Sequence, residues 1–331
     1  MRQKVFVTGS SGFIGGNLVR ALSKKGDSLL LLIRKNSNID LLRYLNADFV
    51  MGSVNDVSSY SHLLKEVDVV YHLAGVVTDW AFKKEYYEVN TEGTKLLLNK
   101  AIEAGVKKFI YISTIDVLKR SRYSHNVIDE FTAYTDTKLP YHRSKMLAEK
   151  YVLENNGVNG IETVVIRPAW VYGPADKTLF PEIIRQLNTS KVVFLVGKKD
   201  TQIPLIYIDN LIDILLKVKD YRSLGGDTFL ASDNEDITWL RLVEKVMKAM
   251  GKKNKIIFLP SLVGHIFGVF SDILFRALNR NTRPTITSIS VEMLSSSIKV
   301  DNRKLVEKLG YKQAIPFADG FIRTMRYFTK V

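Results

Sequence analysis

Residues 4–15 read KVFVTGSSGFIG, and this short stretch decides the fold. An apolar run is followed by glycines at Gly9, Gly12 and Gly15, and helical apolar spacing begins at Phe13. Gly9 allows a tight turn, Gly12 lets a pyrophosphate approach the backbone, and Gly15 lets the helix lie close to the strand. The start of the helix offers free N–H groups to phosphates. The stretch therefore predicts a strand, a loop and a helix that bind a dinucleotide, with a purely structural turn as the alternative.

The sequence beyond this loop alternates strand and helix patterns. Continuous apolar runs, typical of strands covered on both faces, are followed by segments with helical spacing. The strands are expected at 5–8, 28–33, 49–51, 68–73, 108–113 and 161–166, and the helices at 13–24, 90–104 and 141–154. We therefore expect an α/β fold of the Rossmann type, a doubly wound parallel sheet with helices on both faces.

The second half of the chain is less regular. Strands are expected near 192–195, 205–208 and 228–230, helices at 210–218 and 237–250, and a mostly helical tail from residue 261. No internal repeat or long linker separates this half from the first. We predict a dinucleotide-binding domain over 1–168, with returns near 203–231, and a smaller, mixed but mostly helical substrate cap from 169–202 and 232–331.

The composition excludes several kinds of chemistry. The 331 residues contain no cysteine, which excludes disulfides, thiolate metal sites and cysteine nucleophiles. The five histidines show no metal-ligand spacing, so we expect no metal. No secretory signal is seen, and the most apolar window, 256–275, contains Pro260, His265 and Asp272 and so is a poor membrane span. We therefore expect a cytoplasmic protein.

The residues after the second expected strand bear on the choice of cofactor. Ile33 is followed by Arg34 and Lys35, and no carboxylate occurs before Asp40. A carboxylate at this point would bind a free ribose 2′-hydroxyl, whereas Arg34 is suited to a 2′-phosphate. The sequence favours NADP(H), with NAD(H) possible, and an exposed basic turn is the plain alternative.

Two Tyr-x-x-x-Lys matches compete for a catalytic role. Tyr134 and Lys138 precede Pro140, and a proline disfavours helix in the residues before it. Tyr141 and Lys145 follow Pro140, which is tolerated in the first turn of a helix. On a helix these two side chains share a face, so the lysine ammonium and a nicotinamide would stabilise the tyrosine phenolate. The second match is therefore the expected one.

A hydroxyl donor is also expected beside this pair. Ser113 and Thr114 end the strand expected at 108–113, at the edge of the sheet where doubly wound folds bind ligands. Such a donor would orient the substrate oxygen.

With these motifs the sequence resembles the extended short-chain dehydrogenase/reductase family, also called the NAD-dependent epimerase/dehydratase superfamily. Matching segments lie at 8–15, 72–75, 89–94, 112–114, 141–145, 167–174 and 207–210. The resemblance implies Thr114, rather than Ser113, with Tyr141 and Lys145 as the catalytic trio, and Asn90 in a proton relay. Asn90 could also simply cap its helix.

Beside the contacts of the glycine loop, the resemblance implies further cofactor contacts at the ends of the strands. Ser53 departs from the family, which often has an acidic residue there, and Pro168 could simply end a strand. The expected contacts are Gly9, Ser11, Gly12, Phe13, Ile14, Gly15, Arg34, Ser53, Val54, Leu73, Ala74, Gly75, Ile112, Ser113, Tyr141, Lys145, Pro168, Ala169 and Val171.

Within the family, the pattern is closest to the 3β-hydroxysteroid dehydrogenase and dihydroflavonol reductase branch. Sugar-nucleotide members commonly carry a diphosphate-binding arginine where Ile203 stands. Dehydratases need an acid pair after the threonine, and Ile115 follows Thr114 here. The run 114–118 also lacks the Tyr-Gly ending usual in sugar enzymes. The apolar segment 256–274 suits an apolar substrate, with ordinary core packing as the alternative.

The expected function is therefore NADP(H)-dependent interconversion of a carbonyl and an alcohol on a small, apolar substrate. A sugar-nucleotide 4-epimerase with tightly bound NAD is the first alternative, and a non-catalytic cofactor-sensing protein is the second. The family resemblance implies a homodimer through helices that flank the sheet. No nucleic-acid partner is expected, because basic and aromatic residues are not interleaved.

The charge of the chain suggests one further partner. The net charge is +14, and residues 251–331 hold 14 Lys and Arg against 5 Asp and Glu. Basic residues flank the apolar segment 256–275, which suggests that the cap rests on an anionic membrane surface; a plain basic surface is the alternative. These residues are Lys252, Lys253, Lys255, Arg276, Arg280 and Arg283.

Overall fold

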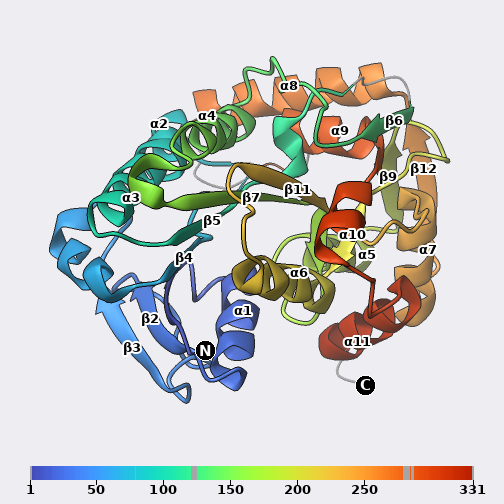
Figure 1. Cartoon of the computed structure of the whole chain (residues 1–331). Coiled ribbons are helices and arrows are strands. Elements are labelled where there is room, and N and C mark those ends of the chain that lie inside the picture. Colours follow the sequence, from blue (N-terminus) through green and yellow to red (C-terminus); the bar gives the residue numbers. More distant parts are fainter. Residues whose placement is uncertain (1, 79, 121–124, 279–283, 285–286, 330–331) are drawn as a thin grey trace.

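The structure, a computed structural model, describes residues 2–78, 80–120, 125–278, 284 and 287–329. At its centre the described strands form a parallel sheet of seven, in the order β11-β7-β5-β4-β1-β2-β3 (Figure 1). The strands are β1 (Lys4–Thr8), β2 (Ser28–Ile33), β3 (Ala47–Met51), β4 (Val69–His72), β5 (Lys108–Ile112), β7 (Glu162–Pro168) and β11 (Asp227–Ala231). The strand order reverses between β1 and β4, so a ligand crevice is expected at their carboxyl ends.

Helices cover both faces of this sheet. On one face α1 (Phe13–Lys24) packs against α6 (Ile208–Asp220), and on the other α3 (Gly93–Glu103) packs against α4 (Pro140–Glu154). The residues of β1 alternate between the two cores: Val5 and Val7 enter one and Phe6 enters the other. This alternation explains why the strands read as continuous apolar runs, and it confirms the predicted doubly wound fold.

The remaining elements surround the carboxyl end of the sheet and one side of it. Three short parallel pairs lie here: β8 (Trp170–Tyr172) with β10 (Leu205–Tyr207), β9 (Val192–Val196) with β12 (Lys255–Leu259), and β6 (His125–Ile128) with β13 (Ser297–Val300). The helices are α5 (Leu179–Thr189), α7 (Trp239–Ala249), α8 (Ser261–Ala277), α9 (Ser288–Ser295), α10 (Arg303–Leu309) and α11 (Phe317–Thr329). Within the described ranges, no helix is both long enough and apolar enough to cross a bilayer.

Short helical turns complete the connections. They are η1 (Val57–Ser59), η2 (Ser61–Glu66), α2 (Lys83–Tyr86), η3 (Tyr87–Glu92), η4 (Ile115–Val117) and η5 (Val158–Gly160). The helix expected at 90–104 starts earlier than its apolar spacing indicates, because η3 is a π-helical turn that leads into α3. Such turns are rare and occur often at functional sites.

Candidate active site

The glycine loop connects β1 to α1 as a tight backbone turn. Gly9 has a φ of +72°, and a Cβ there would lie 2.8 Å from the backbone N of Ala74. A Cβ on Gly15 would lie 2.2 Å from the carbonyl oxygen of Gly9. The Gly12 N–H donates to that same oxygen at 2.9 Å. Side chains are therefore excluded where the helix meets the strand.

This loop fits a cofactor phosphate. α1 begins at Phe13, and no side chain caps it at Gly12. The first N–H groups of a helix have no acceptor within it, and they carry its positive dipole end. Ser11, Phe13 and Ile14 line this start and are partly buried. The loop thus offers backbone donors and an open cradle to an anion.

The end of β4 is tied to the same loop. His72 is buried, with its Nδ1 2.7 Å from Thr8 Oγ1 and its Nε2 2.8 Å from Thr94 Oγ1. Thr94 donates its hydroxyl proton to the carbonyl of Asn90, so Nε2 must carry the imidazole proton. Burial, with the Lys145 charge adding, lowers the pKa of His72 to about 3. His72 is therefore neutral and connects Thr8 at the end of β1 to Thr94 on α3. The sequence did not indicate this structural role.

Leu73, Ala74 and Gly75 continue from β4 along the crevice. The Ala74 N–H donates to Thr8 Oγ1 at 3.1 Å. A Cβ on Gly75 would lie 3.1 Å from Asn90 Oδ1. The backbone here is held close to the glycine loop on one side and to Asn90 on the other.

Arg34 lies at the carboxyl edge of the sheet, after β2. It follows β2 directly and is exposed, and its backbone exchanges hydrogen bonds with Ser37 at 3.0 and 2.8 Å. Ser53 and Val54 follow β3 at the same edge of the sheet. Val54 is buried against Gly93, where a Cβ would come within 2.8 Å of the valine side chain. These residues stand where the adenosine contacts are expected.

The hydroxyl of Thr114 lies directly after β5 and is held by a carboxylate. Its Oγ1 donates to Asp116 Oδ2 at 2.9 Å and accepts from the Asp116 N–H at 3.2 Å. Asp116 Oδ1 accepts from Arg120 at 2.6 Å, and both side chains of this ion pair are buried. Sequence reasoning missed Asp116 and Arg120. Their spacing of two and six residues after Thr114 was the available signal.

Tyr141 lies in the first turn of α4, next to Pro140. Burial and the nearby Asp116 charge raise its pKa above the usual value, and a side-chain hydrogen bond with Thr114 opposes this. The Tyr141 hydroxyl therefore lies within hydrogen-bonding reach of Thr114, and the phenol stays protonated. Its ring also packs 6.3 Å from the ring of Tyr86.

Lys145 lies one turn further along α4 and is buried. Its ammonium donates to the carbonyl of Ile112 at 2.6 Å and stands 4.2 Å from the ring centroid of Tyr111. Burial lowers the pKa of Lys145 to about 7, with the Glu149 charge opposing. In the structure the Lys145 ammonium is thus anchored at the end of β5 by the Ile112 carbonyl. A buried ammonium with one backbone acceptor fits a site that receives further oxygen ligands.

Asn90 does not cap a helix, because it lies inside η3. Its Oδ1 accepts from the Val76 N–H at 2.7 Å, and its Nδ2 donates to the Val76 carbonyl and to Ser144 Oγ, both at 3.1 Å. Ser144 Oγ in turn donates to the Tyr141 carbonyl at 2.8 Å. Asn90 therefore ties the loop after β4 to the catalytic turn of α4.

The competing Tyr134 has a structural role. It lies outside any helix, and its hydroxyl donates to Glu149 at 2.8 Å. Glu149 also accepts from Arg167 Nε at 3.0 Å, in a buried ion pair. The restriction before Pro140 explains why Tyr134 and Lys138 do not share a helix face.

The other expected contacts lie at the carboxyl ends of β5 and β7. Ile112 ends β5, and Ser113 follows with a buried hydroxyl that has no hydrogen-bond partner among the described residues. Pro168 ends β7, and Ala169 and Val171 follow it. A buried unpartnered hydroxyl at this edge is consistent with a bound polar group.

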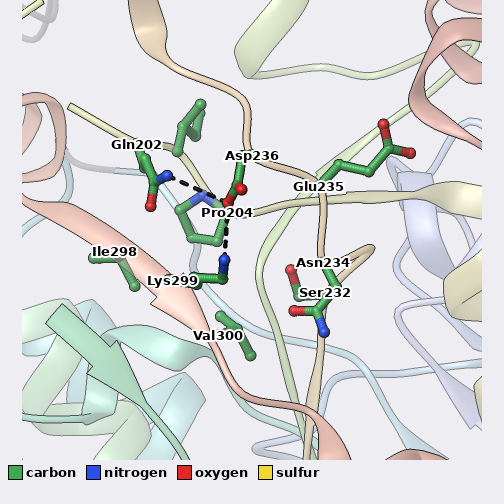
Figure 2. Close-up of a pocket in the computed structure, with 10 residues that line it drawn as sticks. Gln202, Pro204, Ser232, Asn234, Glu235, Asp236, Ile298, Lys299 and Val300 are labelled. Carbon is green, nitrogen blue, oxygen red and sulfur yellow. Dashed lines mark hydrogen bonds and ion pairs between the residues drawn. The ribbon is translucent and has the colours of Figure 1, made fainter. Parts of the chain in front are cut away.

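A small hollow elsewhere is not part of this site (Figure 2). It is lined by residues of β13 and of the segments 202–204 and 232–236, with Lys299 and Gln202 both directed at Asp236. It has room for about one water molecule and includes none of the expected site residues. Across the described residues, no group of three or more His, Asp or Glu could hold a metal ion.

Comparison with known proteins agrees with this geometry. The 3-beta hydroxysteroid dehydrogenase/isomerase family matches residues 6–261. The UDP-glucose 4-epimerase of Vibrio cholerae is 29% identical, over 99% of this chain and 96% of that protein. The 4-hydroxy-2-methyl-3-oxo-4-farnesyl-3,4-dihydroquinoline-1-oxide ketoreductase of Stigmatella aurantiaca is 24% identical, over 96% and 94%.

A solved structure shows the same fold. The UDP-glucuronic acid 4-epimerase from Bacillus cereus, in complex with NAD, superimposes with a TM-score of 0.78 at 23% identity, covering 99% of both chains. The family match confirms the resemblance read from the motifs. The chain belongs to the 3-beta hydroxysteroid dehydrogenase/isomerase family, whose members are NAD(P)-binding oxidoreductases of the extended short-chain type.

Proposed function

We propose that this protein reduces a carbonyl to an alcohol, reversibly, on a small apolar substrate with NADP(H). One observation carries the proposal: the Tyr141 hydroxyl, protonated and next to Thr114, stands at the carboxyl edge of the sheet that also bears the glycine loop. A nicotinamide bound in the crevice supplies a hydride to the carbonyl carbon, or accepts one in the reverse direction.

The proton chemistry follows from the local contacts. Burial and Asp116 hold the pKa of Tyr141 above its usual range, so Tyr141 can donate a proton to the developing alkoxide. Thr114 donates its only hydroxyl proton to Asp116 in the structure, so it would have to redirect that proton in order to donate to the substrate oxygen. In the oxidative direction Tyr141 must lose its proton before it can accept one from the alcohol. A cation beside it is then needed to stabilise the phenolate.

Lys145 supplies that cation when it is protonated. Its pKa of about 7 reflects a buried ammonium with little compensation. Hydroxyl oxygens of a bound ribose would add acceptors and so favour the charged form. We therefore assign Lys145 to the cofactor ribose and to the phenolate of Tyr141.

The preference for NADP(H) rests on Arg34. This exposed guanidinium follows β2 directly, where a ribose 2′-phosphate is expected. Changing Arg34→Ala should lower kcat/KM for NADPH by about 10–100-fold and leave that for NADH nearly unchanged. Arg43→Ala, which removes a neighbouring arginine that pairs with Asp40, is the matched control.

The 4-epimerase is the second candidate, because the UDP-glucose 4-epimerase of Vibrio cholerae aligns with this chain over nearly the whole length of both proteins. Ile203 argues against it. This residue stands where a diphosphate-binding arginine is expected in sugar-nucleotide enzymes, and its side chain is buried in the core. The ketoreductase relative, with its farnesyl-bearing substrate, supports an apolar carbonyl compound instead.

The decisive experiment compares wild type with Tyr141→Phe on a panel of apolar ketones and nucleotide sugars. We expect NADPH oxidation with a ketone, reduced about 100-fold or more in the variant, while NADPH still binds. A variant with full reductase activity would refute the role of Tyr141. A purified protein that retains NAD and interconverts nucleotide sugars would identify the epimerase, and cofactor binding without any turnover would favour a sensing protein.

Three further points stay predictions. They are the division of the chain into 1–168 and a cap, a homodimer through helices that flank the sheet, including α4, and a cytoplasmic location.

A further inference from the structure

The helix α8 exposes large apolar side chains on its outer face and packs against the protein through small residues. It lies along the edge of the molecule above α9, between the end of β12 and the region of α2 and α4 (Figure 1). Its packed face is made by Gly264 and Gly268. A Cβ on Gly264 would lie 2.8 Å from Val196, and one on Gly268 would lie 3.0 Å from the backbone of Ser288. These glycines let α8 approach its support closely, so its large side chains point away.

The outward face carries large apolar side chains at helical spacing. Their exposed fractions lie between 37% and 64%. A soluble protein rarely leaves so long an apolar face uncovered without a binding role. The residues are Leu262, Val263, Ile266, Phe267, Val269, Phe270, Ile273 and Leu274.

The one carboxylate among the described side chains of α8 points away from this face. Of the α8 side chains that the structure describes, Asp272 is the one carboxylate, and it accepts hydrogen bonds from the backbone N–H (3.1 Å) and the hydroxyl of Ser288. It therefore points toward α9. The outward face could enter an apolar phase without burying this charge.

Lysines stand at the two ends of the face. The Gly197 N–H donates to the Leu259 carbonyl at 2.9 Å, which sets exposed Lys198 and Lys199 beside the start of α8. Neither lysine has an ion-pair partner among the described residues. At the other end Phe275 packs against Trp80, at 6.4 Å between ring centroids.

The Trp80 contact joins α8 to the loop beside the active site. Exposed Val77 and Phe82 lie on that loop, and exposed Lys83 and Lys84 follow it. The same loop is bonded to Tyr86, whose ring packs on that of Tyr141. The apolar face therefore extends toward the catalytic turn.

We propose that α8 and this loop dock the protein on an anionic bilayer, with α8 lying in the plane of the interface. A helix with one apolar face and basic residues beside it binds at the boundary between headgroups and acyl chains. Charge at this face favours a bilayer over a second copy of the chain. Exposed Lys198 and Lys199 at the start of α8, together with a net charge of +14, attract anionic lipid.

The structure also changes which lysines matter. Lys252 and Lys253 precede β12, whose five residues separate them from α8 by about 16 Å, more than a Debye length. Lys198 and Lys199, which are distant in sequence, are beside the helix instead. Arg280 and Arg283 lie outside the described residues, as does the side chain of Arg276.

The test is co-sedimentation of the full chain with vesicles of phosphatidylcholine alone or with about one-third phosphatidylglycerol. We expect binding to the anionic vesicles, at least tenfold weaker in Ile266→Ser/Phe270→Ser and in Lys198→Glu/Lys199→Glu. Tyr44→Ser, an exposed aromatic at the β2–β3 connection, and Lys252→Glu/Lys253→Glu should stay within about twofold of wild type. Circular dichroism checks that each variant folds.

Three outcomes would overturn the proposal. The first is no preference for anionic vesicles. The second is equal binding by wild type and both α8-side double variants. The third is a concentration-dependent dimer in light scattering that the Ile266→Ser/Phe270→Ser change dissociates, without vesicle binding, because α8 would then contact a second copy. None of these readouts depends on catalysis.

Discussion

Replacing Lys145 by methionine should make the cofactor-free protein more stable while it abolishes activity. Methionine has a similar length but no charge. Lys145 is buried, and its ammonium donates to the carbonyl of Ile112 at 2.6 Å. Burial lowers its pKa from 10.5 to about 7. The native state therefore holds this proton much less tightly than the unfolded chain does.

The magnitude follows from proton linkage. At pH 7 a shift of this size costs the wild type about 4 kcal/mol of folding free energy. Removing the ammonium leaves the Ile112 carbonyl without this donor, which costs about 1–2 kcal/mol. The net gain for Lys145→Met is about 2–3 kcal/mol. Reductase activity should fall at least 100-fold.

The pH dependence gives the sharper test. Between pH 7 and 10.5 the unfolded chain binds more protons than the native state, so wild-type stability rises with pH over this window. The advantage of Lys145→Met should be greatest at pH 7 and below, and should shrink toward pH 10. Urea denaturation of the cofactor-free proteins, followed by circular dichroism at about pH 6.5, 8 and 9.5, measures it.

A matched control lies on the same helix. Lys150 is partly exposed, with its ammonium 4.8 Å from the ring centroid of Tyr134. Lys150→Met should not raise the free energy of unfolding at low pH, and its effect should not change between about pH 6.5 and 9.5. A Lys145→Met protein that is less stable than wild type at pH 6.5, or whose difference from wild type is the same at every pH, would refute the reasoning.

Two substitutions and one pH profile also test the site and its support. Gly15→Ala should destabilise the protein by about 2–4 kcal/mol in urea denaturation and weaken cofactor binding in calorimetry, because its Cβ would lie 2.2 Å from the Gly9 carbonyl oxygen. Glu149→Gln should cost about 3–5 kcal/mol of unfolding free energy, because it leaves the buried Arg167 guanidinium without its carboxylate. Because the pKa of Tyr141 is raised, kcat for ketone reduction should stay flat from about pH 7 to 9, while kcat for alcohol oxidation rises.

The local features of the site could be predicted from sequence because each is set within a few residues. Gly9 and Gly15 are fixed by one strand-to-helix turn. Tyr141 and Lys145 are fixed by one helix that Pro140 starts, and the same proline excluded Tyr134. Alternating burial of the β1 residues in two cores explains why the apolar runs indicated the sheet.

The contacts between segments could not be predicted in the same way. The carboxylate of Asp116 reaches Thr114 and Arg120 only because the chain turns at η4 after β5, and no periodic pattern encodes that path. Lys145 was expected to stabilise the Tyr141 phenolate and to hold the cofactor ribose, and those roles stay predictions. Its hydrogen bond to the Ile112 carbonyl joins α4 to β5 and was not expected; it satisfies an ammonium that is buried there.

The segment 256–275 shows where composition alone misleads. Its apolar content fits core, lid or membrane contact equally well, since periodicity does not state which face of a helix packs. The packed face of α8 is instead marked by Gly264, Gly268 and Asp272, which recur at four-residue spacing. The two glycines approach their neighbours closely, and Asp272 bonds Ser288. A helix whose small residues face inward presents its large residues outward. The stripe of glycines, rather than the apolar run, was therefore the feature of the sequence that corresponds to the packed face of α8.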